Sequence, residues 1–175
     1  NAGGTSGGVG VSFTGDAQAV QGSSSGIYAA PFLSNSNGTL FGDPNNGADA
    51  TTFITTGTST VTLDLPGAEH YIGLLWGSVD AYNTLELYNG TTIVGTVTGA
   101  NITATDNGNQ GADGTYYVNI NSSLAFTSVV MTSSQNAFEF DNVAYNATAV
   151  PEPAALALFG VGLLGLVVTY RRRSA

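Results

Sequence analysis

Short apolar runs that alternate with polar residues, separated by Gly, Asn, Asp and Pro, predict a chain built from β-strands. STVTLDL at residues 59–65 alternates strictly, which is typical of a half-buried strand. After the Pro66–Gly67 turn, HYIGLLWGS at residues 70–78 is apolar on both faces, which indicates a central strand. No segment before residue 150 shows helical periodicity.

A hairpin is the clearest local prediction. NTLELY at residues 83–88 and TTIVGTVT at residues 91–98 flank Asn89–Gly90, a strong two-residue turn signal. We expect polar turns at residues 43–47 and a loop at residues 106–114. The remaining predicted strands are residues 9–13, 26–33, 115–120, 125–132 and 137–145, with Pro31 confining the second to an edge or a bulge.

Nine or ten strands at a spacing of roughly ten residues predict an all-β fold, an antiparallel jelly-roll-like β-sandwich. A propeller would need longer repeats, and the chain has none. A solenoid of parallel strands is the alternative, and the unequal lengths of the apolar runs argue against it.

A charge-free stretch from Ala154 to Tyr170 predicts a single C-terminal transmembrane helix. At about 1.5 Å per residue it would span roughly 25 Å, close to the hydrocarbon thickness of a bilayer. Arg171, Arg172 and Arg173 follow it as a stop-transfer signal that keeps the C-terminus in the cytoplasm and the preceding chain outside. A buried core helix is the alternative, which Pro-x-Pro before the stretch and the basic cluster after it disfavour.

The tail resembles the PEP-CTERM sorting signal of exported bacterial proteins, on the order Pro151-Glu152-Pro153, apolar helix, Arg cluster. The resemblance implies recognition at those three residues by an exosortase, a membrane enzyme that removes the tail. We therefore expect four parts: a β-sandwich domain at 1–148, the sorting motif at 149–153, a transmembrane helix at 154–170 and a basic tail at 171–175. Since the chain starts at Asn1 and shows no basic-then-apolar leader, we also expect that a secretory signal peptide has been removed or left out.

The charge distribution excludes several classes of partner. The chain has no lysine, and its three basic residues are the terminal arginines, whereas 11 of its 12 acidic residues precede Pro151. Removal of the tail would leave a formal charge of −11 (no basic residue, 11 acidic), so nucleic acid is not expected as a partner. The absence of cysteine excludes disulfides and thiolate chemistry.

The segment WGSVDAYNTL, residues 76–85, resembles a motif of a group of exosortase-dependent surface proteins, as does FEFDNVAY at residues 138–145. This resemblance implies a location and no defined activity. Physically, Trp76 is expected to fill the core, and Asp80 or Asn83 to bond loop N–H groups in an Asx-type turn.

Two binding hypotheses stand beside that structural interpretation. Asp80, Asn83, Asp141 and Asn142 carry hard oxygen ligands, which would form a structural Ca²⁺ site if their loops met at one end of the sandwich. Exposed aromatic rings would stack on sugars, and the candidates are Trp76, Tyr82 and Tyr88. Alternating aromatics in a sandwich are more often core residues.

We expect no enzymatic activity. His70 is the only histidine, no serine lies in a G-x-S-x-G elbow, and a triad needs a nucleophile, a base and an orienting acid together. A two-carboxylate glycosidase using residues such as Asp64 and Glu86 is the weaker alternative.

Proteins with the sorting signal that the tail resembles are exported by bacteria that make extracellular polysaccharide. The resemblance therefore implies an exported bacterial cell-surface or matrix protein, which we expect to be structural or adhesive within an exopolysaccharide layer or biofilm. Its expected partners are the exosortase, the polysaccharide, and the membrane until processing. The alternatives are a carbohydrate-binding module, a permanently tail-anchored protein, and a self-assembling fibre subunit in which residues 9–13 complete the sheet of a neighbour.

Overall fold

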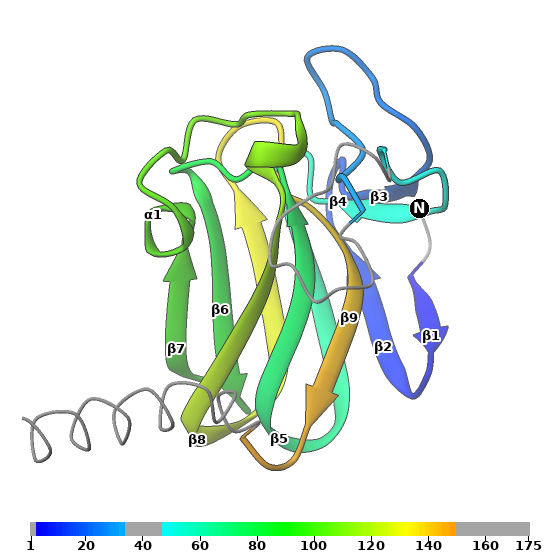
Figure 1. The fold of residues 1–175 in the computed structure, drawn as a ribbon. Coiled ribbons are helices and arrows are strands. Elements are labelled where there is room, and N and C mark those ends of the chain that lie inside the picture. The colour runs from blue at the N-terminus through cyan, green and yellow to red at the C-terminus, as the bar shows by residue number, and fades with distance from the viewer. Residues whose placement is uncertain (1–2, 34–46, 150–175) are drawn as a thin grey trace, which may run out of the picture.

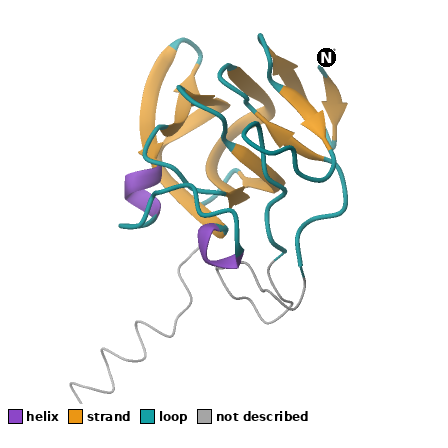
Figure 2. Cartoon of the chain, turned by 90° about the horizontal axis from the view of Figure 1, so that it is seen from above, coloured by secondary structure: helices purple, strands orange, loops and turns teal. Residues whose placement is uncertain are grey.

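The computed structural model describes residues 3–33 and 47–149, and every strand pairing in that part of the chain is antiparallel. The elements in chain order are β1 (Gly4–Ser6), β2 (Val9–Phe13), β3 (Gln18–Val20), β4 (Phe53–Thr55), β5 (Thr60–Gly77), β6 (Asn83–Asn89), β7 (Thr92–Thr98), α1 (Gly99–Ile102), the 3₁₀ helix η1 (Ala112–Gly114), β8 (Tyr116–Ser133) and β9 (Glu139–Asn146). The short helices lie outside the strands (Figure 2).

The two longest strands, β5 and β8, pair along their length and turn back together at the same end of the molecule (Figure 1). Their pairing is regular from Thr60 to Asp64 and again from Tyr71 to Trp76, with register shifts between. Pro66 lies at this irregularity and has no backbone N–H to donate, which explains why the regular ladder stops there.

The bend divides one continuous hydrogen-bonded sheet into two layers. In the first layer, the first half of β5 pairs with β2 and with the second half of β8. This half of β8 also pairs with β6, and β6 pairs with β7. The second half of β5 lies between the first half of β8 and β9, and β4 and β3 extend that layer. The predicted all-β, antiparallel, two-layered character is confirmed, and the jelly-roll connectivity stays a prediction.

Apolar side chains from both layers form one core. β5 contributes at alternate positions of its two halves, as the alternating sequence pattern requires. The largest fully buried core residues are Leu63, Ile72, Leu74, Trp76, Leu85, Leu87, Phe126, Met131, Phe138 and Phe140.

Most predicted strands match the structure. Residues 9–13 form β2, residues 83–98 form the β6–β7 hairpin, and residues 59–65 and 70–78 correspond to the two halves of β5. Residues 115–120 and 125–132 are likewise two halves of one strand, β8. The two predicted strands of each pair are therefore one continuous strand with a bend in it, and not two strands joined by a loop.

The predicted strand at residues 26–33 is wrong. This stretch makes only isolated bridges, from Tyr28 to Ser24 and from Phe32 to Ala48. Its N–H groups at Ala29 and Ala30 bond side chains, Glu139 and Ser23 respectively, and no neighbouring strand pairs there. The strands β1, β3 and β4, each only three residues long, were not predicted from the sequence.

The predicted transmembrane helix at 154–170, the arginines after it and residues 43–46 of the predicted turn lie outside the described residues. Within 3–33 and 47–149, no helix is long and apolar enough to cross a bilayer.

Leu63→Ala tests the core, because Leu63 is 2% exposed and packs between the layers. We expect the free energy of unfolding to fall by about 2–5 kcal/mol in urea titrations. Leu124→Ala is the matched control: Leu124 lies in the bend of β8 and is 56% exposed, so a change above about 1 kcal/mol there would contradict the assignment.

Candidate functional site

The segment after β5 leaves the sheet as a tight loop that is fixed by backbone hydrogen bonds. Ser78 has a φ of 39°, a left-handed conformation that non-glycine residues rarely adopt. The loop at 106–114 lies alongside: Gly108 donates its N–H to the Val79 carbonyl, and Ala81 donates to the Asp106 carbonyl. Gly108 has a φ of +66°, and a Cβ there would lie 2.6 Å from the Asp80 carboxylate, so both its backbone and the close approach require glycine.

Asn83 holds this loop to the rest of the site. Its side chain is fully buried, and its Oδ1 accepts the N–H of Asp80 at 2.9 Å and the indole N–H of Trp76 at 3.4 Å. Its Nδ2 donates to the Ser133 hydroxyl and to the Ala137 carbonyl. The hydrogen-bonding capacity of the amide is therefore used within the chain, in the turn-stabilising role that the sequence predicts.

Trp76 lies beneath the loop and is also fully buried. Its ring stacks on Phe138, with ring centroids 4.0 Å apart and planes 14° apart. It fills the core between β5 and the start of β9, so no face of the ring is open to a sugar.

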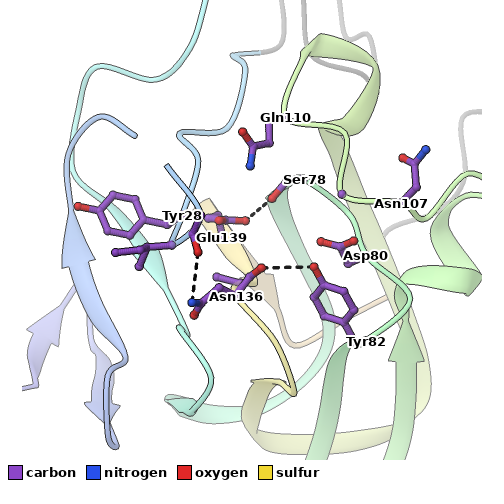
Figure 3. Close-up of a pocket in the computed structure, with 12 residues that line it drawn as sticks. Tyr28, Ser78, Asp80, Tyr82, Asn107, Gln110, Asn136 and Glu139 are labelled. Atoms are coloured by element: carbon purple, nitrogen blue, oxygen red, sulfur yellow. Dashed lines mark hydrogen bonds between the residues drawn. The ribbon is translucent and has the colours of Figure 1, made fainter. Parts of the chain in front are cut away.

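The loop after β5 lines a hydrophilic cavity of about 130 Å³, which we call the motif pocket (Figure 3). Ser78, Asp80 and Tyr82 come from the loop after β5, and Glu139 comes from β9. The other lining residues are Gly26, Ile27, Tyr28, Asn107, Gly108, Gln110, Asn136 and Ala137. Four separate segments of the chain therefore converge on one pocket.

Glu139 is the most buried acidic group of the motif pocket, at 1% exposed. Its Oε1 accepts the N–H of Ala29 at 2.9 Å, and its Oε2 accepts the hydroxyl of Ser78. Burial raises the pKa of Glu139 to about 7, although the two hydrogen bonds oppose the shift and the charge of Asp80 adds to it. Near neutral pH this carboxyl therefore exchanges its proton with little free-energy cost.

Asp80 and Tyr82 form the opposite wall. Burial raises the pKa of Asp80, the charge of Asp106 adds to the shift, and a hydrogen bond from Tyr82 opposes it. Burial also raises the pKa of Tyr82, and so do its hydrogen bond to Asp80 and the charges of Asp80 and Glu139. The Tyr82 hydroxyl lies 3.3 Å from the Asn136 carbonyl, which it reaches as a donor. At neutral pH the Tyr82 hydroxyl is thus protonated, and it is a donor placed between two acceptors, Asp80 and the Asn136 carbonyl.

The structure separates the four residues of the predicted Ca²⁺ site into two pairs. Asp80 and Asn83 are hydrogen-bonded to each other beside the motif pocket. Asp141 instead neighbours Asp49, and together with Asn142 it lines a second cavity of about 300 Å³ beside β1 and β2. Within residues 3–33 and 47–149, no three acidic or histidine side chains cluster as metal ligands would. The Ca²⁺ site stays a prediction, and Asn83 could join it only by giving up its present bonds.

Asp49 and Asp141 form a carboxyl pair. Asp49 is 3% exposed, and no N–H or O–H in the described part of the chain bonds its Oδ2. Burial and the hydrogen bond with Asp49 raise the pKa of Asp141 to about 6, so below about pH 6 a protonated Asp141 is available as a donor to Asp49.

The three predicted stacking residues also lie in different surroundings. Trp76 is in the core, and Tyr82 lines the motif pocket through its phenol group. Tyr88 is half-buried on β6, donates to Glu86 and is not part of the pocket lining. Ser78 and Glu139 lie in the two distinctive segments, 76–85 and 138–145, but the sequence pattern gave neither of them a site role. One sequence signal could have indicated Glu139. It lies between Phe138 and Phe140, which are core residues, and because side chains alternate along a strand, its carboxyl lies on the face opposite to theirs.

Comparison with known proteins identifies the tail. Residues 149–173 match the family model of the PEP-CTERM protein-sorting motif, which confirms the predicted signal at Pro151, Glu152 and Pro153. The signal marks the chain as an exported exosortase substrate. No curated protein matches the chain. A solved family 6 carbohydrate-binding module, studied for its binding sub-sites, is 14% identical, with a TM-score of 0.36 over 75% of this chain and 94% of that one.

Glu139→Gln tests the burial of the carboxyl through pH. Because the pKa of Glu139 is raised from 4.5 to about 7, its protonated form stabilises the fold below pH 4.5, and that stabilisation is lost as pH rises through 7. In the wild type, we expect deprotonation of Glu139 to lower the free energy of unfolding by up to about 3 kcal/mol between pH 4.5 and pH 8. The variant has no carboxyl at this position, so its free energy of unfolding should not show this decrease.

The measurement is urea unfolding at several pH values, compared as wild type minus variant so that the titration of Asp141 cancels. Glu86→Gln is the control, because Glu86 lies on β6 outside the pocket. Parallel pH profiles for wild type and Glu139→Gln would contradict the assignment.

Asn83→Asp tests the buried amide. The carboxylate keeps acceptors for Trp76 and Asp80 but removes the N–H donors to Ser133 and Ala137. We expect a loss of about 2–4 kcal/mol of unfolding free energy, measured in urea. Asn101→Asp is the control, since Asn101 is exposed and only accepts, through Oδ1, from Thr98; equal losses in the two variants would disprove the role of Asn83.

Proposed function

We propose that this chain is an exported bacterial surface or matrix protein whose β domain binds exopolysaccharide through the motif pocket. The sorting signal at residues 149–173 supports the location. The observation that carries the binding role is the hydrophilic pocket built by Ser78, Asp80, Tyr82 and Glu139.

The chemistry of the lining suits hydroxyl-rich ligands. A sugar hydroxyl both donates and accepts, and the pocket offers carboxyl acceptors, phenol and hydroxyl groups, and the amides of Asn107, Gln110 and Asn136. A volume of about 130 Å³ is small beside the roughly 300–1,000 Å³ of typical ligand pockets. The pocket therefore fits one sugar unit, such as a chain end or a side group, and not a long segment.

The proposed role is binding without catalysis. His70, the base that a serine nucleophile would need, lies near the bend of β5 with its Nδ1 2.9 Å from the Ser122 carbonyl. Ser78 donates to Glu139, which holds the hydroxyl in place as part of the wall. An adhesive or structural function in the polysaccharide layer follows from binding at one fixed site on an exported domain.

The fibre alternative receives less support. Its proposed donor strand, residues 9–13, is β2, which pairs with β5 of its own chain and with β1. A strand already paired on both sides has no free edge to offer to a neighbour.

Asp80→Asn and Tyr82→Phe test the binding role. In protein released by the producing bacterium, we expect each variant to weaken binding to the cell's own exopolysaccharide about tenfold or more, because each loses a polar group of the pocket wall. Co-sedimentation with purified polysaccharide measures this.

Tyr88→Phe is the matched control for Tyr82→Phe, because Tyr88 lies outside the pocket lining. If all three variants bind like the wild type while remaining folded, the motif pocket is not the polysaccharide site.

A further inference from the structure

The motif pocket contains negative charge without a counter-charge. Asp80 and Glu139 are 6% and 1% exposed, and Asp106 lies close enough to Asp80 to raise its pKa. No basic residue lines the pocket. In the described part of the chain the single basic side chain is His70, which lies near the bend of β5.

Neutral groups alone stabilise these carboxyls. Glu139 is bonded by an amide N–H and a hydroxyl, and Asp80 shares the single phenol proton of Tyr82 with the Asn136 carbonyl. Buried carboxylates that lack a cation are costly, and a ligand that brings a positive charge gains an attraction that the chain itself does not provide.

We propose that the sugar unit bound in the motif pocket carries a protonated amine, as in a de-N-acetylated amino sugar of a polysaccharide. The inference rests on the proposed function and specifies its ligand. An ammonium group has three donors and no acceptor, which matches a wall of carboxylate acceptors. A uronic acid in the same place would face repulsion from Asp80 and Glu139.

A lysine side chain of a protein partner carries the same ammonium group, but the lining fits it less well. Its four-carbon stem favours apolar walls, and the lining offers only Ile27 and Ala137 with aliphatic side chains. The polar groups of Tyr28, Asn107 and Gln110 instead suit the hydroxyls of a sugar ring.

The pH dependence of binding has a defined sign. Tyr28, Asp80, Tyr82 and Glu139 are the titratable groups that line the pocket, and Asp106 is next to Asp80. An ammonium ligand favours ionised Glu139, whose pKa is about 7 when the pocket is empty, so affinity rises from pH 5 to pH 7. Above the pKa of the amine, the ligand loses its charge and affinity falls.

The test compares four probes on the released protein by isothermal titration calorimetry: a glucosamine oligomer, the same oligomer fully N-acetylated, a glucuronic acid oligomer and a lysine-rich peptide. At the pH of tightest glucosamine binding, found by titrations between pH 5 and pH 8, we expect the glucosamine oligomer to bind at least tenfold more tightly than each of the others. Asp80→Asn and Glu139→Gln are expected to reduce that preference, and Glu86→Gln, outside the pocket, to leave it unchanged.

The outcomes separate the two proposals. Equal or tighter binding of the N-acetylated or acidic oligomer overturns the amine inference and leaves polysaccharide binding standing. Tighter binding of the lysine peptide points to a protein partner and overturns the inference as well. If no oligomer binds, and the native exopolysaccharide does not bind either, the proposed function itself fails.

Discussion

In residues 3–33 and 47–149 the single basic side chain is His70, so the acidic groups of this domain depend on N–H and O–H donors for their stabilisation. Buried Glu139 relies on the Ala29 N–H and the Ser78 hydroxyl. Asp16 is exposed, but the hydroxyl of Ser59 and the N–H of Thr58 bond it in the same way and hold its pKa below its usual range. Asp49 depends on Thr51 and on the neighbouring carboxyl of Asp141. Each of these carboxyls accepts hydrogen bonds from N–H and O–H groups of other residues, either far away in the sequence or within the same turn. In a chain without lysine, these bonds hold the loops in position.

The fold sets the geometry of the site through the folded-back strands. β5 turns back near Pro66 and returns through the centre of its layer, so its C-terminal end lies beside the start of β9. Gly77 pairs with Glu139 there, and the loop that follows brings Ser78, Asp80 and Tyr82 to the same pocket. Asn83 then closes the loop onto the segment before β9 by its bond to Ala137. The pocket is thus a consequence of strand register and one buried amide.

Periodicity was sufficient to predict the strands that face the core, because alternation in 59–65 and the apolar run in 70–78 directly reflect burial. It failed at 26–33, where N–H groups bond the side chains of Ser23 and Glu139, contacts that depend on residues as far as 110 positions away. The WGSVDAYN segment was recognisable as distinctive, but sequence alone did not show that Asp141 would pair with Asp49 and that Glu139 would join Asp80 in one pocket. Long-range register decides such partners, and no local pattern encodes it.

Glu139 is a buried carboxyl without a counter-charge, in a pocket that we propose receives a sugar cation. Carbon-13 NMR of its side-chain carboxyl, followed against pH with and without the glucosamine oligomer, measures this most directly. The account predicts a midpoint near pH 7 in the free protein, in accord with the pKa of about 7, and a lower midpoint with the oligomer bound. A midpoint near 4.5 in the free protein, or one that the oligomer leaves unmoved, would contradict it.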